Sequence, residues 1–366
     1  MKILIAGGGT GGHVNPALAM ANNLRIKYPD AEFLFVGSKR GLENDLVPKE
    51  GYKITNVPVL GFSRKGGLSK LWPYMVLVAG VIKSFFIFLK FKPDLALGTG
   101  GYASGPILFW TSLFKVPTLL HEQNVLPGIT NKMLSKRASI VAVSFPESKN
   151  HLKNAKRVEV TGNPIRKKIL SAKRVDSRAV LGLKENEKLV IIMGGSQGAK
   201  PINDAVVEML DGIYKDGDFK LIYAPGKRHY VAVSSVIKNK FENVEIPSYI
   251  YDADVVYSAA DLIVNRAGAS TISEIAVLGV PAILIPSPYV AENHQEKNAR
   301  TLEANGGCIV LKDEQLSGQV LYNNILSIIN DPIKSESMKK SCKAVGIRDA
   351  LDKLSVLFDE LLEGVE

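Results

Sequence analysis

The amino-acid sequence predicts an α/β protein of two similar domains, each with a parallel sheet flanked by helices. Short apolar strands alternate with helical patterns along all 366 residues, which is typical of such sheets. A strand, a glycine turn and a helix-like segment follow one another at residues 2–13 and again from residue 189. This arrangement brings backbone N–H groups and a helix N-terminus up to an anion, often a phosphate. Its presence in each half suggests two domains that face a central cleft.

The expected strands divide between the two halves of the chain. They lie at 2–6, 32–37, 53–57, 94–97, 117–120, 139–143 and 157–160, and then at 188–193, 219–223, 243–246, 261–264, 281–285 and 307–310. A linker is expected near residues 161–164, because 366 residues exceed the usual size of one core. The predicted domains are therefore residues 1–163 and 164–340, followed by a helical segment, 341–366, that packs back on one of them.

Composition and charge limit the class of protein. There is no low-complexity tract, and the first residues form a strand rather than a signal peptide. Two cysteines make no disulfide framework, so a reducing cytoplasm is expected. The net charge of +10 comes from the first half, where residues 1–163 hold 21 basic and 9 acidic side chains. This excess predicts an acidic partner, either nucleic acid, anionic lipid or a polyphosphate.

Residues 71–92 form the most apolar stretch of the chain. Its length nearly suits a membrane span, but a lysine and a serine interrupt it and a buried-type strand follows at once. We favour a helix that lies on a bilayer surface over a buried helix or a transmembrane one, because basic residues cluster on both sides. The expected membrane contacts are Lys65, Lys70, Trp72, Lys83 and Phe86.

The first glycine turn has the spacing G-x-G-x-x-G, which on its own is a weak signal for a dinucleotide site. The acidic residue that would hold the ribose is missing, since the next strand runs into residues 37–40, Gly-Ser-Lys-Arg. NAD is therefore disfavoured, while an NADP variant that uses Arg40 stays open. His13 lies near the start of the following helix, where the dipole disfavours its protonated form. It is either a general base or a hydrogen-bonded turn residue.

Two further polar segments follow strands of the first half. The loop at 98–106 offers free N–H groups to a second anion, or it is an ordinary strand-to-helix turn. The run His-Glu-Gln-Asn at 121–124 lies where ligands bind in open α/β sheets, and it suits hydroxyl recognition.

The second half has a denser cluster around residues 265–274. Glu274 is either the N3 residue of a capping box that starts at Thr271 or an acceptor for two ribose hydroxyls. Arg266 ends a buried-type strand, so an anionic partner is expected. Arg166 lies at the proposed hinge, where it is either a phosphate ligand or a surface residue. Asp252 and Asp254 match a D-x-D metal pattern, but capping is the better interpretation. No other metal spacing and no phosphate-binding loop of ATPases is present in the sequence.

Taken together, these motifs resemble the MurG family of peptidoglycan N-acetylglucosaminyltransferases over nearly the whole chain. The resemblance is carried by Gly-Gly-Thr-Gly-Gly-His at 8–13, Gly-Thr-Gly-Gly-Tyr at 98–102, His-Glu-Gln-Asn at 121–124, Thr-Gly-Asn-Pro-Ile-Arg at 161–166, Gly-Gly-Ser-Gln-Gly-Ala at 194–199, residues 266–274 and His-Gln-x-x-Asn-Ala at 294–299. Two departures are Ser270, where a leucine is common, and the pair 294–295, where some members have two glutamines.

The resemblance implies a GT-B fold of two Rossmann-like domains, with UDP-GlcNAc bound by the carboxyl-terminal domain and the final helix returned to the first. It implies inverting transfer to the 4-hydroxyl of MurNAc in undecaprenyl-diphosphate-linked muramyl-pentapeptide, with His13 as base and no cofactor or metal. The implied donor-binding residues are Thr10, Gly11, Gly12, Asn124, Arg166, Ser196, Ile250, Arg266, Ala269, Ser270, Thr271, Glu274 and Gln295. The acceptor-binding candidates are Gly100, Gly101, Tyr102 and Glu122.

The resemblance also implies a location on the cytoplasmic face of the bacterial membrane, anionic lipid and cell-wall synthesis proteins as partners, and no nucleic acid. The nearest alternative is glycosyl transfer to another lipid, such as diacylglycerol. An oxidoreductase and a non-catalytic membrane scaffold are rivals from other classes.

Overall fold

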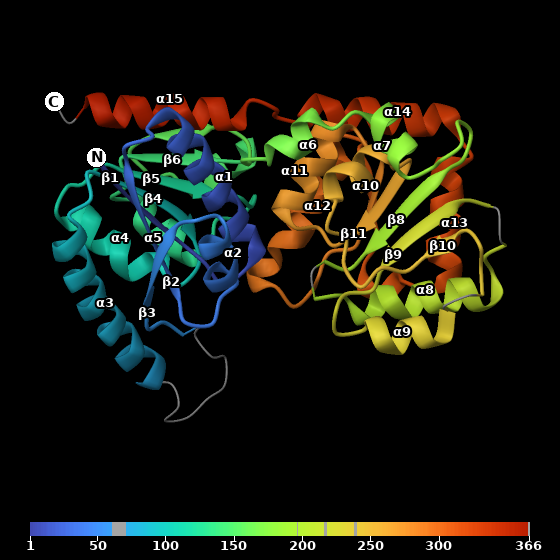
Figure 1. Ribbon diagram of the computed structural model, residues 1–366, viewed down its shortest axis with the longest axis horizontal. Coiled ribbons are helices and arrows are strands. Elements are labelled where there is room, and N and C mark those ends of the chain that lie inside the picture. Colours follow the sequence, from blue (N-terminus) through green and yellow to red (C-terminus); the bar gives the residue numbers. More distant parts are fainter. Residues whose placement is uncertain (61–70, 196, 216–217, 238–239, 365–366) are drawn as a thin grey trace. The chain divides into compact units, whose positions relative to one another are not determined.

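The computed structural model describes residues 1–60, 71–195, 197–215, 218–237 and 240–364. The chain divides into two compact units (Figure 1). Unit 1 comprises Met1–Ile165 and Asp349–Glu366, and unit 2 comprises Arg166–Arg348. The boundaries therefore lie at 165/166 and 348/349, where the sequence suggested 163/164 and 340/341.

Unit 1 contains a seven-stranded parallel sheet with the order β3-β2-β1-β4-β5-β6-β7. Its strands are β1 (Lys2–Gly7), β2 (Glu32–Ser38), β3 (Lys53–Val57), β4 (Leu95–Gly100), β5 (Thr118–Glu122), β6 (Ile140–Val143) and β7 (Val158–Val160). Its helices are α1 (Gly11–Lys27), α2 (Glu43–Lys49), α3 (Leu71–Phe91), α4 (Ser104–Leu113), α5 (Ile129–Ser135), the 3-10 helix η2 (Pro146–His151) and α15 (Ala350–Glu363).

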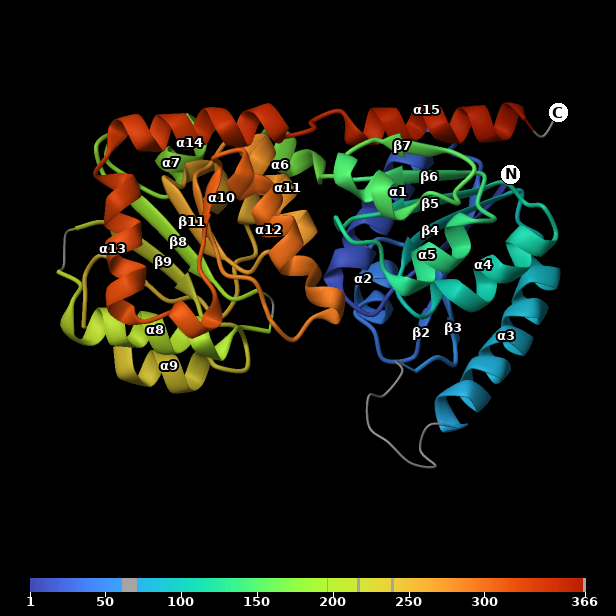
Figure 2. The same ribbon diagram turned by 180° about the vertical axis from the view of Figure 1, so that it is seen from behind.

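Both faces of this sheet are covered, as a parallel sheet requires. Alternate residues of β1 enter different cores, Ile3 and Ile5 on one face and Leu4 and Ala6 on the other. The first core is closed by α1 and by α15, which contributes four buried apolar side chains, and the second by α3 and α4 (Figure 2). The last helix of the chain is thus part of the core of unit 1.

Unit 2 contains a six-stranded parallel sheet with the order β10-β9-β8-β11-β12-β13. Its strands are β8 (Leu189–Met193), β9 (Lys220–Ala224), β10 (Val244–Glu245), β11 (Leu262–Asn265), β12 (Ala282–Leu284) and β13 (Cys308–Val310). Its helices are α6 (Lys167–Ser171), α7 (Arg174–Val180), α8 (Lys200–Gly212), α9 (Tyr230–Ile237), α10 (Ala253–Ala259), α11 (Ala269–Leu278), α12 (His294–Ala304), α13 (Gly318–Ile329) and α14 (Pro332–Val345), with the 3-10 helices η3 (Ala291–Asn293) and η4 (Asp313–Gln315).

The thirteen strands of the described residues lie where the sequence predicted them, within three residues at each end. The strand order reverses between β1 and β4 in unit 1 and between β8 and β11 in unit 2. In open α/β sheets, ligands bind outside the carboxyl ends of strands at such a point. The predicted motifs directly follow β1, β4, β8 and β11, so each unit carries its motifs at its own reversal point.

Helix α3 is the one helix in the described ranges that is long and apolar enough to cross a membrane, by length and composition alone. Only 22% of the most apolar part of this helix, within Pro73–Phe91, is buried. Phe88 and Phe91 pack into the second core of unit 1, whereas Ile82 and Phe86 are exposed. One side of α3 therefore belongs to the domain and the other side is open.

Candidate active site

The first glycine turn connects β1 to α1. Gly9 has φ +91°, a backbone conformation that only glycine adopts readily, and Thr10 is the N-cap residue of α1. Gly11 and Gly12 then open the helix, where N–H groups have no partner within the helix, whereas the N–H of His13 donates to the carbonyl oxygen of Thr10 at 3.1 Å. The turn thus offers free donors and a positive helix end, as the sequence predicted.

Glu43 of α2 holds this turn by a hydrogen bond, a role that could not be recognised in the sequence. Its carboxylate is fully buried and accepts hydrogen bonds from the N–H of Gly9 at 2.8 Å and from the N–H and hydroxyl of Ser38 at 2.7 and 2.8 Å. A Cβ added to Gly8, or to Gly41, would lie within 2.3 Å of a carboxylate oxygen. The small residues on both sides therefore make room for one buried carboxylate.

The glycine-containing loop at residues 98–106, which begins at the end of β4, lies against His13. Gly100 and Gly101 have φ values of +95° and +85°, and a Cβ on Gly100 would be 3.1 Å from the imidazole of His13. His13 Nδ1 lies 2.8 Å from the carbonyl oxygen of Thr99 and 3.0 Å from Oε1 of Gln123. Tyr102 is about half exposed at 49%. The loop after β4 therefore positions the imidazole that the first turn carries.

Glu122, one of the acceptor-binding candidates, has hydrogen-bond partners within unit 1 for both of its oxygens. It is 1% exposed, and its two oxygens accept from the N–H and side-chain amide of Asn124, the N–H of Gly128 and the amide of Asn131. Four donors fill the acceptor positions of a carboxylate. In this structure Glu122 supports the loop that carries Asn124, and its predicted contact with the acceptor stays a prediction.

The second glycine turn, in unit 2, is held by a neighbouring loop rather than by a carboxylate. Gly195 and Gly198 have φ values of +82° and +80°. A Cβ on Gly198 would lie 2.0 Å from the carbonyl oxygen of Pro225, so the two backbones touch. Ser196, the predicted phosphate ligand of this turn, lies outside the described residues.

Arg166 and Glu274, both in unit 2, form an ion pair with an Nη2–Oε1 distance of 3.2 Å. The capping-box interpretation of Glu274 is wrong, because α11 starts at Ala269 with Gly268 as its N-cap, which makes Thr271 the N3 residue. Burial raises the pKa of Glu274, and Arg166 partly offsets that effect. The structure thus brings together two residues that sequence reasoning had linked only through a shared ligand.

The anionic partner expected for Arg266 is Asp313. Its guanidinium binds both carboxylate oxygens of Asp313 and also donates to the carbonyl oxygens of Ile285 and Pro286. These bonds make Arg266 a brace at the end of β11, and its predicted contact with UDP-GlcNAc stays a prediction.

The other residues of unit 2 that were predicted to bind UDP-GlcNAc lie at or just before the starts of helices α10, α11 and α12. Ile250 and Ala269 are buried, and the buried hydroxyl of Ser270 has no hydrogen-bond partner among the described residues. The side-chain oxygen of Gln295 accepts from the N–H of Ser287 at 2.8 Å, which ties the loop after β12 to α12.

The structure places the D-x-D pair at the start of α10. Asp252 occupies the N-cap position of α10, as expected, although its side chain makes no capping bond. Within the described ranges, no three His, Cys, Asp or Glu side chains gather in a way that could hold a metal ion.

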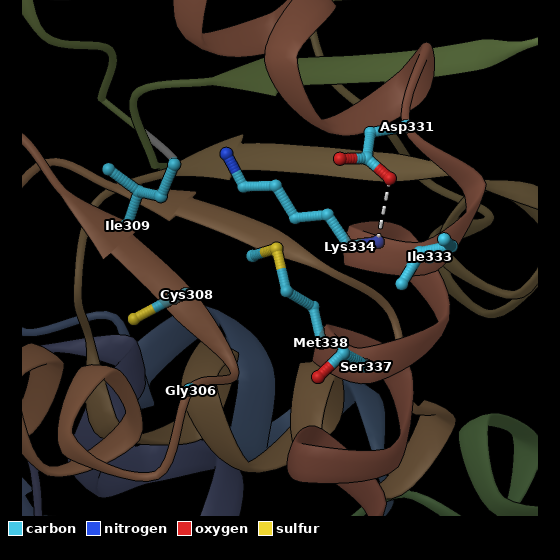
Figure 3. Close-up of a pocket in the computed structure, with 8 residues that line it drawn as sticks. All are labelled: Gly306, Cys308, Ile309, Asp331, Ile333, Lys334, Ser337 and Met338. Carbon is cyan, nitrogen blue, oxygen red and sulfur yellow. Dashed lines mark hydrogen bonds between the residues drawn. The ribbon is translucent and has the colours of Figure 1, made fainter.

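A cavity of about 440 Å³ opens elsewhere on unit 2 (Figure 3). Residues of β13 and of α14 line it, including Cys308, Lys334 and Met338, and the Lys334 N–H donates to Asp331 at its edge. None of the predicted site residues lines this cavity.

Comparison with known proteins identifies the class first. Residues 3–143 match the glycosyltransferase family 28 N-terminal domain, and residues 189–354 match the glycosyltransferase family 28 C-terminal domain. The protein is therefore a glycosyltransferase, and its two parallel sheets are those of the GT-B fold that the motifs implied.

Full-length relatives narrow the class to one family. A UDP-N-acetylglucosamine--N-acetylmuramyl-(pentapeptide) pyrophosphoryl-undecaprenol N-acetylglucosamine transferase of Ruminiclostridium cellulolyticum is 43% identical, over 99% of this chain and 100% of its own. The Bacillus subtilis protein of the same name is 42% identical over 99% of both chains. The crystal structure of Acinetobacter baumannii MurG matches with a TM-score of 0.78 and 26% identity, over 98% of this chain and 99% of its own. The chain belongs to the MurG family.

Proposed function

We propose that this chain transfers GlcNAc from UDP-GlcNAc to the 4-hydroxyl of MurNAc in undecaprenyl-diphosphate-linked muramyl-pentapeptide, a step of peptidoglycan synthesis. One observation carries the proposal: the 40–44% identity, over essentially the full length, to relatives that bear this activity in their names. The reaction joins the sugar to the acceptor oxygen and releases UDP.

Unit 2 binds the donor in this proposal. Glu274 accepts hydroxyls of the ribose, because a carboxylate has two oxygens for two donors. Arg166 is half exposed at 49%, so its guanidinium can exchange Glu274 for a phosphate without first being uncovered. The second glycine turn adds backbone N–H groups to the diphosphate, in the manner of other anion-binding turns.

Unit 1 holds the acceptor and the base. Both partners of His13 Nδ1 are oxygens, the carbonyl oxygen of Thr99 and the side-chain oxygen of Gln123. Carbonyl and amide oxygens only accept hydrogen bonds. Nδ1 therefore donates, and in the neutral ring Nε2 carries a lone pair that can take a proton. As the acceptor hydroxyl loses its proton to Nε2, its oxygen attacks the anomeric carbon and the bond to the diphosphate breaks. One in-line displacement inverts α to β.

The loop at 98–102 is the proposed site for the lipid diphosphate. Gly100 and Gly101, which both have positive φ values, form the proposed anion-binding part, and Tyr102 follows them in the chain. Thr10, Gly11 and Gly12 extend the same set of donors around His13.

The exposed side of α3 is the proposed contact with the cytoplasmic face of the membrane. Met75, Val78, Ile82 and Phe86 are each more than half exposed, and Lys83 lies on the same open side. Apolar side chains next to lysines suit a bilayer surface with anionic lipid. Lys65 and Lys70 lie outside the described residues, as does the side chain of Trp72, and their part in this contact stays a prediction.

Backbone N–H groups, helix ends and Arg166 supply the positive charge that the leaving diphosphate needs, so we propose that no metal or cofactor takes part. UDP-GlcNAc and the lipid-linked acceptor are the substrates. Cell-wall synthesis proteins are further proposed partners, and nucleic acid is not.

The test is transfer of radiolabelled GlcNAc from UDP-GlcNAc to a synthetic lipid-linked muramyl-pentapeptide, with diacylglycerol as the competing acceptor. We expect label only in the disaccharide product, with and without EDTA. Label in the diacylglycerol instead would refute the proposed acceptor, and loss of transfer in EDTA would refute the metal-free mechanism.

A further inference from the structure

Three side chains of unit 1 form one continuous series of hydrogen bonds that reaches from the first glycine turn into the core. His13 Nδ1 lies 3.0 Å from Oε1 of Gln123, Gln123 Nε2 lies 3.0 Å from Nδ1 of His121, and His121 Nε2 lies 3.0 Å from the carbonyl oxygen of Gly162. His121 is the second-last residue of β5, which pairs with β4 (Figure 1). Thr99 of β4 also contacts His13.

The chemistry of each partner fixes every proton in this series. The Gly162 carbonyl can only accept, so Nε2 of His121 must donate, and Nδ1 of the neutral ring then carries a lone pair. The Gln123 amide meets that lone pair and, at 3.0 Å, the carbonyl oxygen of His121, so its NH₂ group faces two acceptors. Its oxygen is therefore turned toward His13 and requires a proton on Nδ1. A flipped amide would set an oxygen against both acceptors.

The surroundings keep the series in this one state. His121 is fully buried and Gln123 is 1% exposed, so water does not compete for their hydrogen bonds. Burial lowers the pKa of His121 to about 4, which keeps its ring neutral at the pH of a cytoplasm. The protons within the series therefore stay in place, and His13 takes up a substrate proton only at Nε2, outside the series.

We propose that Gln123 and His121 are positioning residues that hold His13 in the tautomer with its proton on Nδ1 and its lone pair on Nε2. In aqueous solution an imidazole populates both neutral tautomers, and only one of them presents a base at Nε2. The Thr99 carbonyl, at 2.8 Å, orients the same Nδ1–H but does not fix the Gln123 amide. The proposal deepens the proposed function and rests on His13 as the base.

The first experiment reads the proton directly. The chain has five histidines, so ¹⁵N-histidine labelling and a His13→Ala variant are enough to assign the signals of His13 in the full-length protein. At neutral pH we expect the Nδ1–H tautomer of His13 and the Nε2–H tautomer of His121. A His13 signal from the Nε2–H tautomer would overturn the proposal, whatever the activity.

The second experiment separates positioning from folding. Gln123→Leu should lower kcat by about 10- to 100-fold, the range seen when a partner that orients a histidine is lost. It should leave KM for both substrates unchanged, since neither positioning residue touches them. Gln319→Leu, a change in an exposed amide of α13, is the matched control. A Gln123→Leu variant with the wild-type kcat would overturn the positioning role.

A pair of variants at His121 gives a test by rescue. In His121→Asn, the side-chain oxygen can take the place of Nδ1 and accept from Gln123, whereas His121→Leu offers no acceptor. We expect the asparagine variant to recover kcat and the Nδ1–H signal of His13 relative to the leucine variant. Equal values for the two would contradict the proposed series. If His13→Ala itself keeps wild-type turnover, the base assignment fails, while the spectrum still decides the positions of the protons.

Discussion

Replacing Glu43 by glutamine tests whether one buried carboxylate holds the first glycine turn. Oε2 of Glu43 accepts from Gly9, while Oε1 accepts twice from Ser38. A glutamine that keeps its oxygen toward Ser38 must turn its NH₂ group toward the N–H of Gly9. The opposite orientation turns the NH₂ group toward the N–H of Ser38, whose hydroxyl can then accept from it. The isosteric change therefore costs one backbone hydrogen bond, and in the orientation that keeps both Ser38 bonds it is the bond to the turn.

The expected loss of stability is small, and the expected loss of activity is larger. Gly9 is exposed, so water can replace part of the lost hydrogen bond. We therefore expect the free energy of unfolding to fall by about 1 kcal/mol. The released turn carries Thr10 to His13, and a displacement of about 1 Å in a catalytic group can cost about 100-fold in rate. We therefore expect kcat to fall by about 10- to 100-fold in a variant that stays folded.

Tryptophan fluorescence makes this test specific for unit 1. Both tryptophans of the chain, Trp72 and Trp110, belong to that unit, so urea unfolding followed by their emission reports on it alone. Turnover is measured on the same preparation by GlcNAc transfer. Glu147→Gln, a change in an exposed carboxylate of unit 1, is the matched control. A Glu43→Gln variant with wild-type turnover would show that the turn holds its shape without the carboxylate.

Four further outcomes follow from the structure. His13→Ala should lower kcat by about 10²- to 10⁴-fold with folding preserved, and wild-type turnover would remove His13 from the mechanism. Glu274→Gln should raise KM for UDP-GlcNAc by about 10-fold or more, because a charged acceptor for ribose hydroxyls is lost, and an unchanged KM would place the ribose elsewhere. Lys83→Gln combined with Phe86→Ser should weaken flotation with liposomes that contain anionic lipid, and undiminished flotation would rule out the open side of α3 as the contact. Because burial lowers the pKa of His121 from 6.5 to about 4, unit 1 should keep the full contribution of this residue above pH 6.5 and lose up to about 3 kcal/mol as the pH falls toward 4. The decline in urea midpoint should be shallower in His121→Asn, and parallel curves would contradict the low pKa.

The strands could be predicted from the sequence because each is a short buried run next to a glycine or a polar break. Residues 189–193 show this well, since four of the five are buried and the glycine turn follows directly. The same local pattern located the two glycine turns and the N-cap position of Asp252. Signals of this kind lie within a few residues of one another, where sequence periodicity is informative.

The partners of charged residues could not be predicted in the same way, because they come from distant segments. Glu43 binds Gly9 across 34 positions, and Arg266 binds Asp313 across 47. For Arg266 the need of a guanidinium at the end of a buried strand for an anion was predicted correctly. In the structure that anion is the carboxylate of Asp313. For Glu43 the only local signal was a glutamate two residues after Gly41, which also suits an ordinary turn.

Glu274 shows how a local rule can give the wrong structure. The spacing Thr-x-x-Glu satisfies a capping box, but the small residues Gly268 and Ala269 let the helix begin three residues earlier. Glu274 is then placed one turn inside α11, where its carboxylate can meet Arg166 rather than a backbone N–H at the helix end. The position of a helix start thus decides whether this carboxylate caps a helix or faces a guanidinium.

The two glycine turns that looked alike in the sequence are supported by different chemistry. In unit 1 the turn is bound to a buried carboxylate, and the helix that follows carries an imidazole whose proton is placed by Gln123. In unit 2 the turn is pressed against backbone, with Gly198 against Pro225, and no room remains for a side chain at that contact. A turn fixed by hydrogen bonds to a carboxylate keeps a reacting group in register, whereas a turn fixed by backbone packing needs no side chain to hold it. The difference is the one expected if the first turn serves the acid–base step and the second serves the donor diphosphate.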